Sequence, residues 1–249
     1  MNLSGNTILI TGGSSGIGLE LCKQLVHKKN TVIICGRSLE KLQEAKSQFP
    51  EVEIIQCDLA DKKQCEELIH RVKSNYSKIN VLINNAAIVN KIDFIGTENA
   101  LEMAENEIAI NFLAPLNLIK ELYTTLQQNL HPNIITITTG LVYTPRTDYP
   151  FYCGTKAALH SFTQVLRKQT ENDKVKITEV LFPSVSTPWH KGNPPKMAIS
   201  PEKAVSQMLK GLEKEKAEIK VGKVKLLYII SRFAPGFAFK KVNSIQNEQ

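Results

Sequence analysis

The sequence predicts an α/β fold, a doubly wound parallel sheet of seven strands with helices on both faces. Short apolar, β-branched runs alternate with longer segments in which apolar residues recur at helical spacing, and this alternation is typical of parallel sheets. The 249 residues, 42% hydrophobic and 22% charged, can build a large core. Because no repeat, low-complexity tract or linker interrupts the pattern, we expect a single domain over residues 1–249.

Each expected element follows from one of these two periodicities. The first strand, 7–11, is short and β-branched, and the helix after it, 16–28, carries leucines at helical spacing. The second strand, 31–35, repeats the first pattern. By the same criteria we expect strands at about 52–57, 80–83, 134–139, 175–181 and 217–221, and helices at about 38–48, 61–76, 98–128 (as one helix or two), 152–172 and 201–214. The segment 223–247 is helical in pattern and interrupted at Pro235-Gly236.

Two stretches, 140–151 and 186–199, carry neither periodicity. Ligands bind outside the carboxyl ends of the strands in open α/β sheets, so we expect both loops to flank a site. Either loop can close over a substrate, and we expect 186–199 to become ordered when ligands bind. The single tryptophan, Trp189, lies in the second loop, where packing and substrate contact both stay open as its role. His190 is interpreted as a surface histidine.

A glycine-rich turn follows the first strand and carries the first chemical signal. Gly12-Gly13-Ser14-Ser15-Gly16-Ile17-Gly18 leads directly into the first helix. Glycines allow the backbone to approach a pyrophosphate closely, and the helix N-terminus beyond them offers free N–H groups. The spacing G-x-x-x-G-x-G is also compatible with an ordinary strand–helix turn, but a second strand after the helix favours a Rossmann-type dinucleotide site.

Arg37 follows that second strand at the position where a carboxylate would bind the adenosine ribose of NAD. A guanidinium instead suits a 2′-phosphate, so the sequence predicts NADP(H) as the cofactor. The competing interpretation is that Arg37 forms a surface salt bridge.

Tyr152 and Lys156 are four residues apart in an expected helix and therefore share one face. A free phenol has a pKa of ~10, and a nearby ammonium group lowers it. The pair predicts a proton donor and acceptor for the interconversion of an alcohol and a carbonyl. Taken alone, the same spacing also fits the start of an amphipathic helix with an exposed lysine.

Taken together, these segments resemble the short-chain dehydrogenases/reductases. Their DltE-like subgroup is resembled at Gly140-Leu141, Tyr152-Cys153, Thr155-Lys156-Ala157-Ala158-Leu159-His160-Ser161-Phe162, and in the tail at Glu218, Gly222, Arg232 and Pro235-Gly236. The resemblance to the family rests on Thr11-Gly12-Gly13-Ser14-Ser15-Gly16-Ile17-Gly18, Cys57-Asp58-Leu59, Asn84-Asn85-Ala86-Ala87, Asn111, Thr139, Tyr152 and Lys156, which occur in family order and spacing over nearly the whole length.

The resemblance implies four catalytic positions. Tyr152 exchanges the proton, and Lys156 tunes Tyr152 and holds the nicotinamide ribose. Thr139 orients and polarises the substrate oxygen, and Asn111 supports Lys156 through a water and a local helix irregularity. It also implies cofactor contacts from Gly12, Ser14, Ser15, Gly16, Ile17, Gly18, Arg37, Asp58, Leu59, Asn85, Ala86, Val185 and Thr187, together with Tyr152 and Lys156.

Three positions depart from the family pattern. Thr139 stands where the family has serine; it keeps a hydroxyl but adds a methyl group. Ala87 replaces a glycine, and Phe182-Pro183 replaces a Pro-Gly pair. We therefore expect an NADP(H)-dependent oxidoreductase acting on a small-molecule alcohol or carbonyl, with a non-catalytic NADP(H)-binding sensor or scaffold as the alternative.

The charge distribution limits the classes of binding partner that we expect. The net charge is +7, but the lysines are scattered over helical faces, so we expect no nucleic-acid partner. A denser basic extension, 223–249, leaves peripheral membrane contact open. No apolar run is long enough to span a membrane. The five cysteines show no metal-ligand spacing and suit a reduced, cytoplasmic compartment. We also expect a homodimer or homotetramer.

Overall fold

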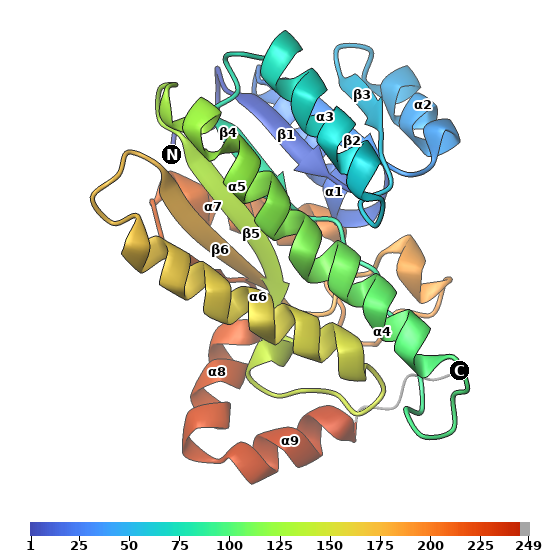
Figure 1. Cartoon of the computed structure of the whole chain (residues 1–249). Helices are drawn as coiled ribbons and strands as arrows, with labels where there is room; N and C mark the ends of the chain where they lie inside the picture. The colour runs from blue at the N-terminus through green and yellow to red at the C-terminus, as the bar shows by residue number, and fades with distance from the viewer. Residues whose placement is uncertain (245–249) are drawn as a thin grey trace.

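The computed structural model describes residues 1–244, and within them seven parallel strands form one sheet in the order β3-β2-β1-β4-β5-β6-β7 (Figure 1). The strands are β1 (Thr7–Thr11), β2 (Thr31–Gly36), β3 (Glu53–Gln56), β4 (Val81–Asn84), β5 (Asn133–Thr139), β6 (Lys176–Phe182) and β7 (Glu218–Lys220). The chain builds outward from β1 in one direction and from β4 in the other. The doubly wound α/β fold expected from the sequence is therefore confirmed.

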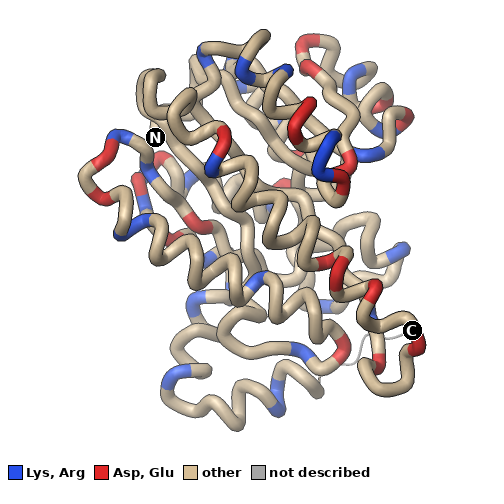
Figure 2. The backbone as a smooth tube through the Cα atoms, in the orientation of Figure 1, with Lys and Arg blue, Asp and Glu red and all other residues tan. Residues whose placement is uncertain are grey.

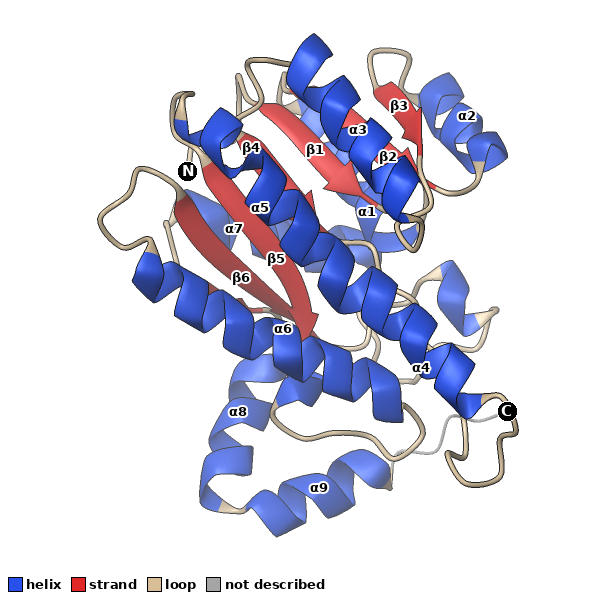
Figure 3. Ribbon diagram, in the orientation of Figure 1, coloured by secondary structure: helices blue, strands red, loops and turns tan. Residues whose placement is uncertain are grey.

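Helices cover both faces of this sheet (Figure 3). One face carries α1 (Gly16–His27), α2 (Leu39–Gln48) and α7 (Pro201–Glu213). The other carries α3 (Lys62–Asn75), α5 (Ala114–Gln127) and α6 (Pro150–Gln169). Alternate residues of a strand enter opposite apolar layers, so Ile8 and Ile10 pack toward α1 and α7 whereas Leu9 packs toward α3 and α5.

The structure defines three helical segments more closely than the sequence did. The expected helix 98–128 is divided into α4 (Ala100–Ile108) and α5 by a π-helical stretch, Ala109–Leu113. Helix α6 begins at Pro150 instead of 152, because proline suits the first helical turn. The expected helix 223–247 is two helices, α8 (Val224–Phe233) and α9 (Pro235–Asn243), separated at Ala234; residues 245–247 of that prediction lie outside the described part.

The carboxyl ends of β1, β4, β5 and β6 meet at one edge of the sheet, close to the start of α6 (Figure 1). Helices α8 and α9 lie beyond this edge, apart from the layers that cover the sheet. In the described part of the chain, no helix has the length and apolar character needed to cross a bilayer.

Candidate active site

The turn between β1 and α1 has the shape of a phosphate-binding turn. Gly12 and Gly16 have φ angles of 65° and 55°, in the left-handed region that favours glycine. A Cβ at Gly18 would lie 2.1 Å from the carbonyl oxygen of Gly12, so this close approach also requires glycine. Ser15 precedes α1 without capping it through its side chain. The first N–H groups of α1 thus remain available to an anionic ligand, and the residues fit a dinucleotide.

Hydrogen bonds from Asn85 connect this turn to the end of β4. Its side-chain amide donates to the carbonyl oxygens of Thr11 and Gly12 at 2.9 and 3.2 Å. The Thr11 hydroxyl in turn accepts the backbone N–H groups of Asn85 and Ala86, both at 3.0 Å. The Asn85 nitrogen is therefore engaged with the protein backbone, and Asn85 holds the shape of the turn.

The other expected cofactor residues lie around the same edge. A Cβ at Gly16 would meet the Thr187 methyl group at 3.3 Å, so loop 186–199 starts beside the glycine turn. Val185 is buried and pairs with Ile199 across the base of this loop. At the end of β3, the Asp58 N–H donates to Gln64 and the Asp58 carboxylate accepts the N–H of Ala60.

Arg37 is exposed directly after β2. Its backbone carbonyl accepts a hydrogen bond from Gln56 at 3.0 Å. Among residues 1–244, no acidic side chain forms an ion pair with its guanidinium, so the surface salt bridge considered above is not found.

Tyr152 and Thr139 meet where the first turn of α6 reaches the carboxyl end of β5. Burial raises the pKa of the Tyr152 phenol well above its ordinary value, and a hydrogen bond with the Thr139 side chain lowers it only in part. The Thr139 hydroxyl also accepts the N–H of Leu141 at 3.3 Å, which fixes its direction. The phenol is therefore protonated at neutral pH and can donate its proton.

Lys156, one helical turn after Tyr152, is buried. Only 2% of its surface is exposed, and its Nζ donates to the carbonyl oxygen of Ile137 at 2.8 Å. Burial lowers the Lys156 pKa to about 8, although the negative charge of Glu179 acts to raise it. Burial is the largest influence on the Tyr152 pKa, and the Lys156 amino group is turned toward Ile137; the expected lowering of the Tyr152 pKa by Lys156 stays a prediction.

Asn111 lies inside the π-helical stretch between α4 and α5, so the predicted helix irregularity is present. Its side-chain amide pairs in both directions with the backbone of Ile88, at 2.9 Å each. It also donates to Thr155 at 3.3 Å and to Glu107 at 3.4 Å. The Asn111 amide thereby links the loop after β4 to Thr155 of α6, the residue that precedes Lys156.

Glu107 is a buried acidic residue bonded to the candidate site that sequence reasoning missed. It is fully buried, and its carboxylate accepts the N–H and the side-chain amide of Asn90, both at 2.9 Å. Burial raises the pKa of the Glu107 carboxyl, whereas these hydrogen bonds act to lower it. A signal was available, since Glu107 precedes Asn111 by one helical turn within an apolar segment.

A row of polar residues crosses the sheet below the site and was also missed. Asn84, Thr136, Glu179 and Glu218 are paired in register on β4, β5, β6 and β7. The Asn84 amide and the Thr136 hydroxyl are buried with no hydrogen-bond partner among the described residues. A polar layer therefore runs beneath the candidate site, on the face covered by α6.

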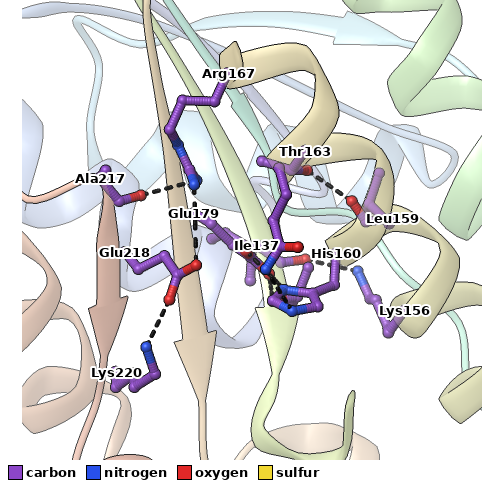
Figure 4. Close-up of polar contacts among 12 residues, drawn as sticks. Ile137, Lys156, Leu159, His160, Thr163, Arg167, Glu179, Ala217, Glu218 and Lys220 are labelled. Carbon is purple, nitrogen blue, oxygen red and sulfur yellow. Dashed lines mark hydrogen bonds and ion pairs between the residues drawn. The ribbon is translucent and has the colours of Figure 1, made fainter. Parts of the chain in front are cut away.

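Glu179 is the centre of this layer (Figure 4). The carboxylate has no exposed surface, yet it accepts the Thr138 hydroxyl at 2.5 Å and contacts Nδ1 of His160 at 2.8 Å. His160 follows Lys156 by four residues and shares its face of α6. A single acidic residue in the apolar strand 176–182 was the signal that could have located it.

Aromatic side chains border the site on the loop side. The Trp189 ring contacts the edge of Tyr149, with centroids 5.6 Å apart, and its Nε1 donates to the carbonyl oxygen of Val89 at 3.4 Å. Phe94 and Phe151 form a second edge-to-face pair at 5.9 Å. Loop 186–199 thus touches both the loop after β4 and the segment that leads into α6.

Comparisons with known proteins agree with this geometry. A family model described as short chain dehydrogenase matches residues 6–198. The chain is 40% identical over 252 residues to an uncharacterized oxidoreductase, DltE, of Bacillus subtilis, covering 99% of this chain and 100% of that protein.

Solved structures share the fold at low identity. A short chain dehydrogenase from Burkholderia cenocepacia in complex with NADP superimposes with a TM-score of 0.85 at 22% identity, over 97% of this chain and 99% of that one. A 3-ketoacyl-(acyl-carrier-protein) reductase from Brucella melitensis complexed with NADH gives 0.77 at 18% identity, over 89% and 99%. Proteins of this fold thus bind either dinucleotide.

Proposed function

Because this chain belongs to the short-chain dehydrogenase family, we propose that it is an NADP(H)-dependent oxidoreductase that interconverts a secondary alcohol and a carbonyl compound. The observation that carries the proposal is the hydrogen bond between Tyr152 and Thr139, together with the buried Lys156 one turn further along the same helix. When bound, a nicotinamide cofactor supplies the hydride chemistry. The protein's part is to hold the substrate oxygen and to move one proton.

In the reducing direction, Tyr152 gives its phenolic proton to the carbonyl oxygen. Its high pKa favours the protonated form that this direction needs. Thr139 offers a second hydroxyl to the same oxygen, as a hydrogen-bond donor that stabilises the developing charge. The added methyl group leaves that capacity intact, so we propose that Thr139 replaces the family serine.

Lys156 carries the positive charge of the site. An amine with a pKa of about 8 is mainly protonated at pH 7, so Lys156 can favour the phenolate that Tyr152 becomes after it gives up its proton. The bond to Ile137 fixes the amino group in a defined position. Asn111 supports this arrangement through Thr155, the residue next to Lys156.

The first turn of α1 is proposed to hold the cofactor pyrophosphate, and Arg37 the 2′-phosphate of NADP(H). The uncapped N-terminus of α1 supports the first assignment. The exposed position of Arg37, without an ion pair to a described acidic residue, supports the second. The choice between NADP(H) and NAD(H) depends on this single guanidinium.

A panel of secondary alcohols, ketones and aldehydes, followed by NADPH absorbance, tests the function. We expect NADPH-dependent turnover of at least one compound by the wild type and none by Tyr152→Phe, with cofactor binding nearly unchanged. Tyr149→Phe removes a neighbouring phenol and serves as the control. Equal turnover by Tyr152→Phe would refute the catalytic assignment, and cofactor binding without turnover of any compound would favour the sensor or scaffold alternative.

A further inference from the structure

The two C-terminal helices present an exposed apolar surface, here called the C-terminal stripe: Leu226, Ile229 and Phe233 on α8, and Phe237 and Phe239 on α9. The exposed fractions of these side chains are 54%, 43%, 88%, 62% and 45%. The α8 members are spaced by three and four residues, so they lie on one face of the helix. Exposed apolar groups gathered in this way mark interaction surfaces more often than single exposed side chains do.

The side of α8 opposite its stripe residues is packed, and α9 is held to the rest of the protein at two points. Val224 is buried at the start of α8, and a Cβ at Gly140 would meet it at 3.1 Å. Ala238 is buried on α9. At the end of α9, Asn243 donates to the Pro145 carbonyl oxygen at 3.1 Å and accepts the Thr147 N–H at 2.8 Å. The α8 residues of the stripe therefore face away from a fixed support, and Phe237 and Phe239, two residues apart, extend the exposed apolar surface on different sides of α9.

The charges carried by α8 and α9 themselves have one sign. Between residues 219 and 244 the chain has no Asp or Glu, and its six cationic residues are Lys220, Lys223, Lys225, Arg232, Lys240 and Lys241. Figure 2 shows Lys and Arg along α8 and α9 without Asp or Glu. On α8, Lys225 and Arg232 lie on one flank of the stripe and Lys223 on the other, by helical spacing.

We propose that α8 and α9 dock the protein on an anionic lipid bilayer, with the C-terminal stripe in the interfacial layer and the flanking cations at the headgroup phosphates. An apolar helix face bordered by Lys and Arg is the arrangement that binds such a surface. A second copy of the chain fits less well, because a two-fold contact through this surface would place like charges opposite one another. The inference does not depend on the proposed reaction.

Vesicle co-sedimentation with the purified full chain tests the proposal. Vesicles of phosphatidylcholine with 30% phosphatidylglycerol are compared with pure phosphatidylcholine, at low and high salt. We expect binding to the anionic vesicles, weakened about tenfold or more on neutral vesicles or at high salt, since each cation contributes separately. Phe233→Ser with Phe237→Ser, and separately Lys240→Gln with Lys241→Gln, should each reduce binding by about tenfold or more.

Matched controls come from the rest of the surface. Leu130→Ser removes a leucine that is 80% exposed away from α8 and α9, and Lys62→Gln removes a lysine whose side chain is 88% exposed; both should bind as the wild type does. Circular dichroism and melting temperature confirm that the variants fold.

Three results would overturn the proposal: equal binding to both vesicle types, wild-type binding by folded stripe variants, or no vesicle binding together with a dimer that dissociates in Phe233→Ser, Phe237→Ser. The last result, measured by analytical ultracentrifugation, would assign the stripe to a second copy of the chain.

Discussion

Nδ1 of His160 lies 2.8 Å from a Glu179 carboxylate that has no exposed surface. The pair connects α6 to β6 one helical turn beyond Lys156. A buried carboxylate is costly unless it is hydrogen-bonded and balanced by positive charge. Here the Thr138 hydroxyl and His160 supply the bonds, and the Glu179 charge raises the pKa of Lys156 against the effect of burial. Glu179 is thus a positioning residue for the charge of the site.

Replacing Glu179 with Gln should lower the Lys156 pKa below about 8, because the group that raises it loses its charge. Lys156 then loses its proton at a lower pH, and the catalysis that needs its charge declines there. The alkaline limb of the kcat/KM profile should therefore move to lower pH. Glu218→Gln is the control: Glu218 is its neighbour in register on β7 and pairs with Lys220. Identical alkaline limbs in wild type and Glu179→Gln would contradict the effect of the Glu179 charge on the Lys156 pKa.

The buried Lys156 should make stability depend on pH with a definite sign. Its pKa is about 8 in the folded chain and 10.5 as a free side chain, so the unfolded chain binds more protons between these values. The free energy of unfolding contributed by Lys156 therefore rises as pH increases through this window and is constant below it. The penalty at pH 7 is on the order of 3 kcal/mol.

Lys156→Met removes that penalty, which raises the free energy of unfolding. It also removes the hydrogen bond to Ile137, and this loss lowers the free energy of unfolding by about 1 kcal/mol. We expect the variant to be more stable than the wild type at pH 7 and the difference to shrink between pH 8 and 10. Urea unfolding at several pH values measures this, with Lys62→Met as an exposed-lysine control. A difference that stays constant over the whole range would contradict the buried, titrating lysine.

Thr139→Ser should keep activity, because it retains the hydroxyl that contacts Tyr152. Thr139→Val is nearly isosteric but has no hydroxyl, so kcat should fall by about a hundredfold to a thousandfold, the usual loss for one donor at a developing oxyanion. Steady-state kinetics on a substrate found in the panel gives both numbers. Undiminished kcat in Thr139→Val would mean that this hydroxyl does not act on the substrate.

Arg37→Ala should weaken NADPH binding by about tenfold to a thousandfold and leave NADH binding almost unchanged. The reason is the loss of up to two charge-assisted hydrogen bonds, worth about 1.5–3 kcal/mol each, to a phosphate that NADH lacks. Calorimetric titration of both cofactors measures the two affinities. If the wild type binds both equally and the variant does as well, the preference for NADP(H) is wrong.

Loop 186–199 should become protected when cofactor and substrate bind. Lys191 and Gly192 have φ angles of 49° and 88°, two successive left-handed residues at which the loop can bend. We expect slower tryptic cleavage after Lys191 and Lys196 in the ternary complex, while cleavage at exposed Lys62 stays unchanged. Mass spectrometry of timed digests identifies the sites. Equal cleavage with and without ligands would leave Trp189 a packing role against Tyr149.

The local pattern of the sequence determined the elements and the glycine turn. Strand and helix periods depend on neighbouring residues, so the order of elements and the positions of Gly12 and Gly18 were predictable. The same is true of Tyr152 and Lys156, because a separation of four residues places two side chains on one helix face. The break near Pro235 was predictable for a similar reason, since proline lacks the N–H that would continue the helix.

Only the tertiary structure decided the electrostatics of the site. The ionisation of Tyr152 depends on how deeply the fold buries it, and burial is the largest influence on its pKa. Glu179 reaches His160 because parallel strands fix their register through hydrogen bonds between distant segments. The backbone groups that Asn85 and Glu107 bind, at Gly12, Thr11 and Asn90, were set by the folded chain and not by local spacing. Burial and register are set by the packing of the whole chain, which no local pattern contains.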